Sequence, residues 1–185
     1  MRRHRVRNTV NAALGGALSA ALALAAGGCG SPSAQRVSDA RIPFTFTVPA
    51  HLSVEHVAYT QTDPPILVEA ATGLGDDYDH VDVRRAKAAA VSEAAMVAGL
   101  DRFGSAGPTI SVLEPPRTET HSGLRTATGA FRLIDGSQAV HIVIYTFATA
   151  GSTWEMECEA TQPRRSTVDN ACNQAINSIQ ANRSK

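Results

Sequence analysis

Several motifs that define common functional classes are missing from this chain of 185 residues. It has no glycine-rich phosphate loop, no cysteine and histidine cluster at zinc-ligand spacing, no paired-carboxylate motif and no G-x-S-x-G nucleophile elbow. These motifs place the groups that bind phosphates or metals, or that attack substrates, so their absence removes the usual signs of an enzyme. The sequence therefore predicts a protein that is not an enzyme, with no cofactor and no bound metal.

An apolar run long enough to cross a membrane is also absent. The longest run, Ala12 to Ala26, has about 15 residues and is rich in Ala and Gly, whereas a membrane-spanning helix needs roughly 20. Four positive residues precede this run (Arg2, Arg3, Arg5 and Arg7). A charged start, an apolar core and the small residues that follow are the order of a secretory signal peptide.

Cys29 follows the small residues Ala26-Gly27-Gly28, as in the lipobox of bacterial lipoproteins, although the lipobox most often carries Leu where Ala26 stands. A thiol at this position accepts a diacylglyceryl group before cleavage, and the mature chain then begins at the acylated cysteine, with palmitate as a typical acyl group. We therefore expect a lipoprotein anchored in the cell membrane through Cys29 and facing its extracytoplasmic side. An unlipidated signal or a membrane helix are the alternatives.

Lysine is scarce, with only Lys87 and Lys185, and positive charge is not in excess. Four of the 17 basic residues and none of the 17 acidic ones lie in the signal, so the mature chain has 13 basic residues and a net charge of −4. Nucleic-acid binding requires a basic face, and we expect none here. The preference for Arg and Ala over Lys suggests an actinobacterial genome.

Cysteine is rare as well, and the pair left after Cys29 is Cys158 and Cys172. Outside the cytoplasm an even pair of cysteines favours a disulfide. Cys158 falls on the apolar side of the alternating segment Thr153–Thr161, and Cys172 falls on the apolar side of a helical pattern that ends near Gln180. The two patterns both favour this disulfide, because a helix that packs its apolar side on the apolar side of the strand brings the two thiols together.

We divide the chain into a signal (1–28), a polar flexible tether (29–41) and one globular domain (42–182). Alternating or continuous apolar segments predict strands at 42–48, 55–60, 66–70, 110–113, 124–134, 139–148 and 153–161. Pro115-Pro116 terminates the strand at 110–113. An Ala-rich stretch predicts a helix from Val83 to Phe103, and a second helix runs from Ser166 or Thr167 to Gln180. The fold class is α+β, an antiparallel sheet flanked by helices.

The acidic loop 75–82 is the strongest candidate for a ligand site, with Asp76, Asp77, Asp79 and Asp82. It lacks the central Gly and distal Glu of a calcium loop, so a solvated loop whose last Asp caps the helix is favoured. A row of three acids (Glu155, Glu157 and Glu159) is interpreted as a solvated sheet face, with a basic partner as the alternative.

Two histidines are weaker candidates. His121-Ser122-Gly123 places a base beside a hydroxyl, but without any motif we interpret it as a turn. His141 lies inside an apolar strand, where a histidine with satisfied hydrogen bonds is favoured over a ligand or a base. No ligand-binding residue is assigned.

The order of these elements carries a family resemblance. After the signal come the strand Phe44-Thr45-Phe46-Thr47-Val48-Pro49, an Ala-rich helix, the hairpin Leu124–Ala148 around Asp135-Gly136, a further strand and a last helix. This order resembles the actinobacterial and mycobacterial lipoproteins of the LpqN type. The resemblance implies a PsbP-like α/β/α sandwich and a non-catalytic envelope protein, and it brings no catalytic residues.

We therefore expect a lipid-anchored binding or scaffolding module of the cell envelope. Its partner is expected to be an envelope protein, a glycan or a lipid. The alternative is a carrier or sensor that holds a lipid or glycolipid in an apolar pocket between sheet and helix.

Overall fold

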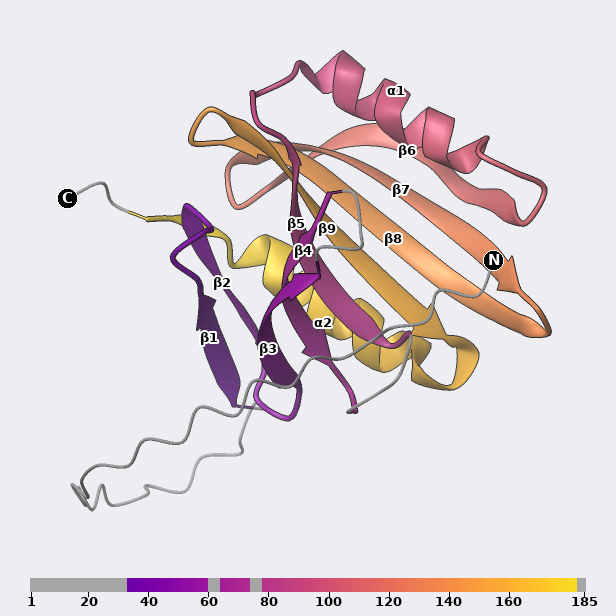
Figure 1. Ribbon diagram of the computed structural model, residues 1–185, viewed down its shortest axis with the longest axis horizontal. Coiled ribbons are helices and arrows are strands. Elements are labelled where there is room, and N and C mark those ends of the chain that lie inside the picture. The colour runs from indigo at the N-terminus through magenta and orange to yellow at the C-terminus, as the bar shows by residue number, and fades with distance from the viewer. Residues whose placement is uncertain (1–32, 60–63, 74–77, 183–185) are drawn as a thin grey trace. The chain divides into compact units, whose positions relative to one another are not determined.

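The computed structural model describes residues 33–59, 64–73 and 78–182, and these fold into two antiparallel sheets and two α-helices (Figure 1). The larger sheet has seven strands in the order β3-β4-β5-β9-β8-β7-β6. Their bounds are β3 (Ser53–Tyr59), β4 (Ile66–Ala71), β5 (His80–Lys87), β6 (Ile110–His121), β7 (Leu124–Asp135), β8 (Gln138–Thr149) and β9 (Ser152–Thr161).

Tight turns join the four strands from β6 to β9. Ser122 and Gly123 between β6 and β7, and Ala150 and Gly151 between β8 and β9, all have positive φ. This is the backbone of a two-residue hairpin turn, whose twist matches that of the strands. The predicted hairpin turn is present one residue later than predicted, at Gly136 and Ser137, because Asp135 ends β7 and pairs with Gln138, and Gly136 has φ 61°.

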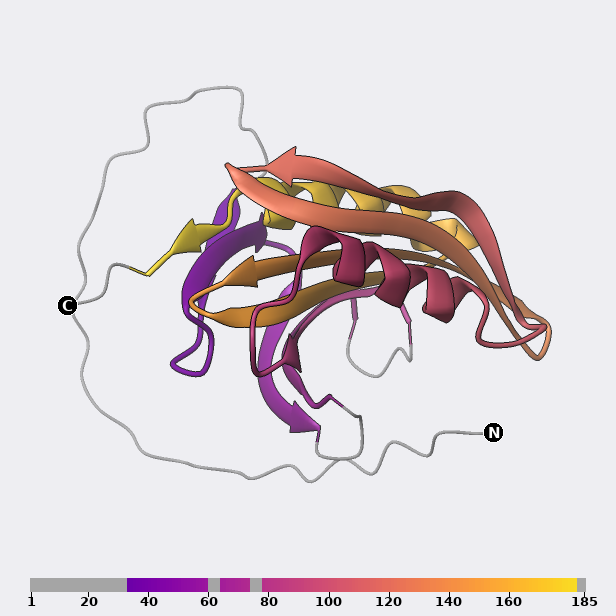
Figure 2. The same cartoon turned by 90° about the horizontal axis from the view of Figure 1, so that it is seen from above.

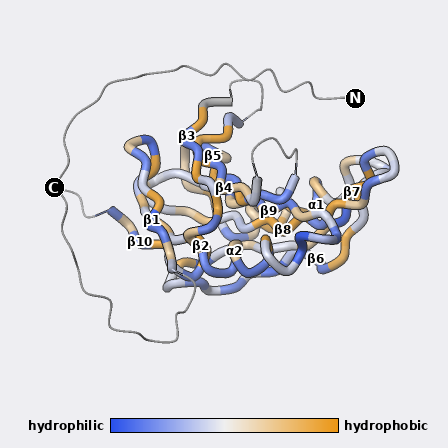
Figure 3. Tube along the Cα trace, turned by 90° about the horizontal axis from the view of Figure 1, so that it is seen from below, coloured by the Kyte–Doolittle hydropathy of each residue, from blue (hydrophilic) through white to orange (hydrophobic). Residues whose placement is uncertain are grey.

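A small sheet and a helix cover one face of the large sheet. The small sheet has the order β1-β2-β10, with β1 (Ala34–Ser38), β2 (Phe44–Pro49) and β10 (Gln180–Ala181), and beside it lies α2 (Arg165–Asn177), which follows the short 3₁₀ helix η1 (Gln162–Arg164) (Figures 1 and 2). Together they form the main core, in which Phe44 meets Phe147 and Trp154 edge to face. Hydrophobic and hydrophilic residues alternate along the strands (Figure 3). Successive side chains of a strand point to opposite faces, so the two faces of the sheet carry different side chains.

The other face carries α1 (Glu93–Gly104), which lies across β6, β7 and β8. Met96 and Leu100 of α1 pack on Phe131, Ile142 and Ile144 in a second core. The helix begins at Ser92, whose Oγ accepts a hydrogen bond from the Ala95 amide at 3.3 Å.

The α+β class is confirmed, but the single predicted sheet is wrong, because the strand at Phe44–Pro49 belongs to the separate small sheet. The sandwich is confirmed only in part. One face of the large sheet carries α1 alone, whereas the other carries α2 together with the small sheet.

Three predicted boundaries are also wrong. Ala34–Ser38, within the predicted tether, forms β1 because it pairs with β2 over its whole length. Residues 83–87, predicted as helix, extend strand β5, since Val81 and Val83 alternate with polar residues and enter the main core. The strand predicted to end at Leu113 continues to His121, because β6 is an edge strand whose register shifts at Glu114 accommodate Pro115 and Pro116.

The predicted signal (1–28) and Cys29 lie outside the described residues. Within the described part of the chain, no helix has the length and apolar character that crossing a membrane requires.

Candidate functional site

A groove lies on the face of β6, β7 and β8 opposite to α1. Its floor is Thr128 and Ala130 of β7 with Val143 and Tyr145 of β8, and α2 forms one wall. The other wall is the charged side of β6. The cavity has a volume of about 310 Å³ and opens to solvent. We call it the sheet–helix groove. The residues of its walls and ends are Glu114, Arg117, Glu119, His121, His141, Arg165, Asp169, Cys172 and Asn173.

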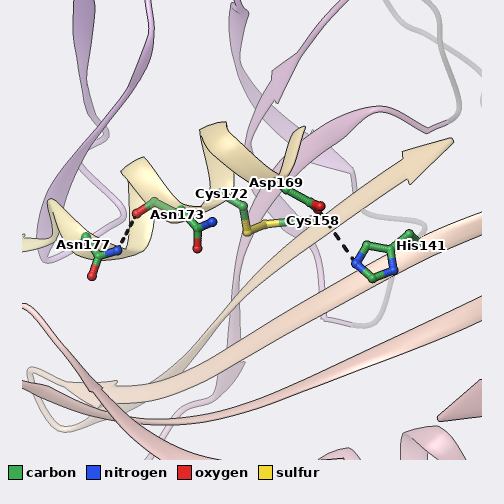
Figure 4. The surroundings of a disulfide bond; sticks show 6 residues. All are labelled: His141, Cys158, Asp169, Cys172, Asn173 and Asn177. Atoms are coloured by element: carbon green, nitrogen blue, oxygen red, sulfur yellow. Dashed lines mark hydrogen bonds and ion pairs between the residues drawn. A yellow bond between two sulfur atoms is a disulfide. The ribbon is translucent and has the colours of Figure 1, made fainter. Parts of the chain in front are cut away.

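The groove exists because α2 covers only part of the sheet. The disulfide between Cys158 of β9 and Cys172 of α2, with Cα atoms 6.1 Å apart, ties the helix over β9 (Figure 4). Since β6, β7 and β8 lie beyond β9 in the sheet, their face beside the helix stays open. The predicted disulfide is confirmed, and Cys172 itself lines the groove.

One end of the groove is closed by His121. Its Nδ1 lies 3.0 Å from Oδ1 of Asn177 in α2, and its Nε2 lies 2.9 Å from Oε2 of Glu119. The ring meets Tyr145 edge to face at 5.3 Å between centroids. The neighbouring Ser122 donates its hydroxyl hydrogen to the Asn177 carbonyl. The turn after β6 is therefore held against the end of α2.

Ion pairs run along both walls. On β6, Arg117 donates hydrogen bonds to Glu114 Oε2 at 2.8 Å and to Glu119 Oε1 at 2.7 Å. These bonds raise the pKa of Arg117, and the bond to Glu114 has the largest effect. Burial raises the pKa of Glu119, but hydrogen bonds from His121 and Arg117 bring it below the usual 4.5. On α2, Arg165 Nε lies 3.4 Å from Asp169 Oδ2. Both arginines of the walls are thus paired with carboxylates.

His141 stands at the other end of the groove, on β8. Its side chain is 11 % exposed, and its Nε2 is 3.9 Å from Asp169 Oδ1, beyond hydrogen-bond distance (Figure 4). Its Nδ1 is buried with no hydrogen-bond partner among the described residues. Burial, with a smaller effect from Arg165, lowers the pKa of His141 below 6.5 and keeps the ring neutral. The expectation of a satisfied histidine is therefore wrong.

Tyr145 supplies a hydroxyl to the floor. No described residue forms a hydrogen bond with that hydroxyl, and Tyr145 is one of the residues that line the cavity. Burial raises the pKa of Tyr145 above 10, so the group is a neutral phenol at physiological pH. The groove thus combines paired charges on its walls with neutral hydrogen-bonding groups on its floor.

The two predicted histidines, 20 residues apart in the sequence, therefore line one cavity. The turn predicted at His121-Ser122-Gly123 is confirmed only for Ser122 and Gly123, because His121 is the last residue of β6, and its ring closes the groove. Sequence analysis missed Glu114, Arg117, Tyr145 and Asp169. A signal existed in Arg117 and Glu119 after the prolines, but the predicted strand ended at Pro115-Pro116, whereas β6 continues to His121.

The acidic loop does not form a site in the described part of the chain. Asp79 is 6 % exposed and accepts hydrogen bonds from the Thr161 amide at 2.6 Å and the Thr161 hydroxyl at 2.9 Å. Asp82 lies within β5 and does not cap a helix, contrary to the prediction, because Ser92 caps α1. Asp76 and Asp77 lie outside the described residues.

The acidic row on β9 is not a solvated face. Glu155 accepts a hydrogen bond from Arg84 of β5 at 2.6 Å, Glu157 is buried and pairs with the same guanidinium, and Glu159 lies 3.8 Å from His80 Nε2. The prediction of solvation was wrong because β5 pairs directly with β9 and places His80 and Arg84 in register with Glu159 and Glu155.

No protein-family model matches the chain, and no curated protein matches it in sequence. Solved structures do match it. Cyanobacterial PsbP (CyanoP) from Synechocystis superposes with a TM-score of 0.59 at 15 % identity, over 85 % of this chain and 98 % of that one. LpqN of Mycobacterium tuberculosis, described as involved in cell envelope biogenesis, gives 0.57 at 11 % identity, over 80 % and 90 %. The chain therefore has a PsbP-like fold.

Proposed function

We propose that this chain is a lipoprotein of the LpqN type with a PsbP-like α/β/α sandwich. It is held on the outer face of the cell membrane by lipid on Cys29 and acts as a non-catalytic binding module through the sheet–helix groove. The observation that carries the binding role is the groove itself, in which His141 and Tyr145 have hydrogen-bonding groups without partners among the described residues. A ligand that completes the hydrogen bonds of such groups gains binding energy from them.

A non-catalytic role is supported by the way the reactive groups are held. Both ring nitrogens of His121 are engaged, one with Asn177 and one with Glu119. The Ser122 hydroxyl is engaged by the Asn177 carbonyl. Neither group is free as a base or a nucleophile, whereas the groove keeps a stable shape that suits binding.

The anchor is supported by the order of charge, apolar run and small residues before Cys29, and the envelope role by the fold shared with LpqN. A protein confined to a membrane surface meets its partners at high local concentration, so modest affinity suffices. The sequence led us to expect either a binding module or a carrier of a lipid or glycolipid. The polar lining of the groove favours a polar ligand over an acyl chain.

Mass spectrometry of the full chain, expressed in an actinobacterial host, tests the anchor. We expect the intact mass to correspond to a chain that starts at an acylated Cys29, recovered in the membrane fraction. Cys29→Ala should lose the acyl mass and leave the membrane. The double variant Cys158→Ala with Cys172→Ala is the control, and it should keep both the acyl mass and the membrane location. An unacylated wild-type chain would overturn the anchor.

Native mass spectrometry after gentle extraction tests the binding role. We expect a retained small molecule or a co-purifying envelope partner, lost in Val143→Phe, which fills the groove floor. Ile134→Phe, an exposed position on the same sheet outside the groove, should retain it. Retention that is equal in the two variants would contradict the groove as the binding site.

A further inference from the structure

The groove offers four uncharged polar groups that no described residue satisfies. They are Nδ1 of His141, which is buried, the hydroxyls of Tyr145 and Thr128, and the side-chain amide of Asn173, which is an exposed residue. They come from both the floor and the α2 wall, so a molecule in the groove meets them from two directions. Each accepts or donates, or does both, which suits a ligand with several hydroxyl groups.

The charged groups of the groove are already paired with one another. Arg117 is held between two carboxylates of β6, and Arg165 faces Asp169 on α2. Three carboxylates and two guanidinium groups line the cavity, a small negative excess. An anionic ligand would have to displace these pairs and approach Glu114 and Glu119, which disfavours it.

The middle of the floor is apolar. Ala130 and Val143 lie side by side in the register of β7 and β8, between the polar groups at the two ends of the groove. A volume of about 310 Å³ is at the small end of the range for ligand sites, enough for a compact molecule rather than a long chain. An acyl chain would also leave the buried Nδ1 of His141 unpaired.

We propose that the sheet–helix groove binds a neutral sugar unit of an envelope glycan. The C–H face of the sugar would lie on Ala130 and Val143, while its hydroxyls bond to His141, Tyr145 and Asn173. This inference rests on the proposed binding role of the groove and names its ligand class. A peptide strand fits less well, because the free groups are side chains on a sheet face and not the open backbone of an edge strand.

Saturation-transfer NMR and calorimetry on the full lipidated protein test the inference. The protein is kept in a zwitterionic detergent, since detergents with sugar head groups would compete. The probes are neutral oligosaccharides built from glucose, mannose, galactose or arabinose, with a uronic-acid disaccharide, a sugar phosphate and palmitate for comparison. We expect a neutral oligosaccharide to bind and the three other probes not to bind.

The variants remove single hydrogen bonds. Tyr145→Phe and Thr128→Val should each weaken binding about tenfold, which corresponds to one buried hydrogen bond. Tyr78→Phe is the matched control, because the Tyr78 hydroxyl donates to Asp135 at 2.7 Å and its ring packs in the core under α1, away from the groove. It should leave sugar binding unchanged. Far-UV circular dichroism checks that each variant is folded.

The outcomes separate this inference from the proposed function. Binding of only the anionic probes, or of palmitate, would overturn the neutral-sugar assignment and leave the groove as a binding site. Binding of a neutral sugar that is unaffected by Tyr145→Phe and Thr128→Val would place the sugar elsewhere and overturn the inference. If no sugar binds while a co-purifying protein is lost in Val143→Phe, the inference fails and the binding module remains.

Discussion

At the scale of single residues, His141 shows how burial selects a protonation state. Its ring faces Arg165 and Asp169 of α2 and Glu114 of β6, and burial is the largest influence on it. Burial penalises the imidazolium, Arg165 does so as well, and the two carboxylates offset this only in part. The folded protein therefore holds His141 as a neutral group with hydrogen-bonding capacity.

This predicts a pH dependence of stability. Because the folded pKa of His141 lies below the unfolded value of 6.5, the unfolded chain binds more protons in the window between the two values. The free energy of unfolding should have its full value above pH 6.5 and should decrease as the pH falls through that window. His141→Gln should make the pH dependence shallower there, measured by urea unfolding at a series of pH values.

His51→Gln is the control for this experiment, since His51 is exposed in the turn after β2 and lies outside the groove. It should leave the pH profile as in the wild type. A His141→Gln profile that superposes on the wild-type profile would show that burial does not perturb this histidine.

At the scale of elements, two glycines in one helix have opposite roles. Gly104 ends α1 against the sheet, and a Cβ added there would lie 2.8 Å from Val112 Cγ2 and 3.0 Å from Phe131 Cε1. Gly99 lies inside the same helix, where an added Cβ meets only the end of the Arg102 side chain at 3.8 Å. The close approach of the helix to β6 and β7 therefore depends on Gly104 and not on Gly99.

Gly104→Ala should destabilise the protein by about 1–3 kcal/mol, since Phe131 is fully buried and the helix end must shift. Gly99→Ala should stabilise it by about 0.5–1 kcal/mol, because alanine loses less backbone entropy in a helix. The pair is compared by thermal and urea unfolding. Equal effects of the two substitutions would contradict the tight contact at Gly104.

The elements also show where periodicity misleads. Residues 83–87 contain alanine and were predicted as part of the helix, but Val81 and Val83 alternate as in a strand, and β4 and β9 both pair with β5. In β6, prolines that end a central strand are tolerated because one side of the strand has no neighbour. Pairing partners distant in sequence decided both cases.

At the scale of the whole molecule, one core joins the two sheets and α2. Trp154, the single tryptophan, lies in that core with Phe44 of the small sheet, and Cys158 and Cys172 belong to it too. The small sheet and α2 therefore have little independent stability, and the described part of the chain should unfold as a unit.

Replacing both disulfide cysteines by alanine should lower the free energy of unfolding by about 3 kcal/mol, the value for a loop of this length in the chain-entropy model. Urea unfolding is followed by Trp154 fluorescence and by far-UV circular dichroism, and the two curves should coincide. The reduced wild-type protein should match the double variant. Separate transitions would show that the small sheet unfolds independently.

The sequence by itself determined the α+β class, most strands, the last helix and the disulfide. These depend on local alternation, on helical spacing and on two cysteines whose apolar faces are evident from their neighbours. It also identified His121 and His141 as candidates, but not their relation to each other.

Only the tertiary structure decided that the strands form two sheets and that the groove exists. The groove is assembled from β6, β7, β8 and α2, and its shape depends on how far α2 extends over the sheet once the disulfide holds it to β9. Local patterns report which face of a segment is apolar. They carry no information on which distant segment will cover that face, because this depends on packing between residues far apart in the chain.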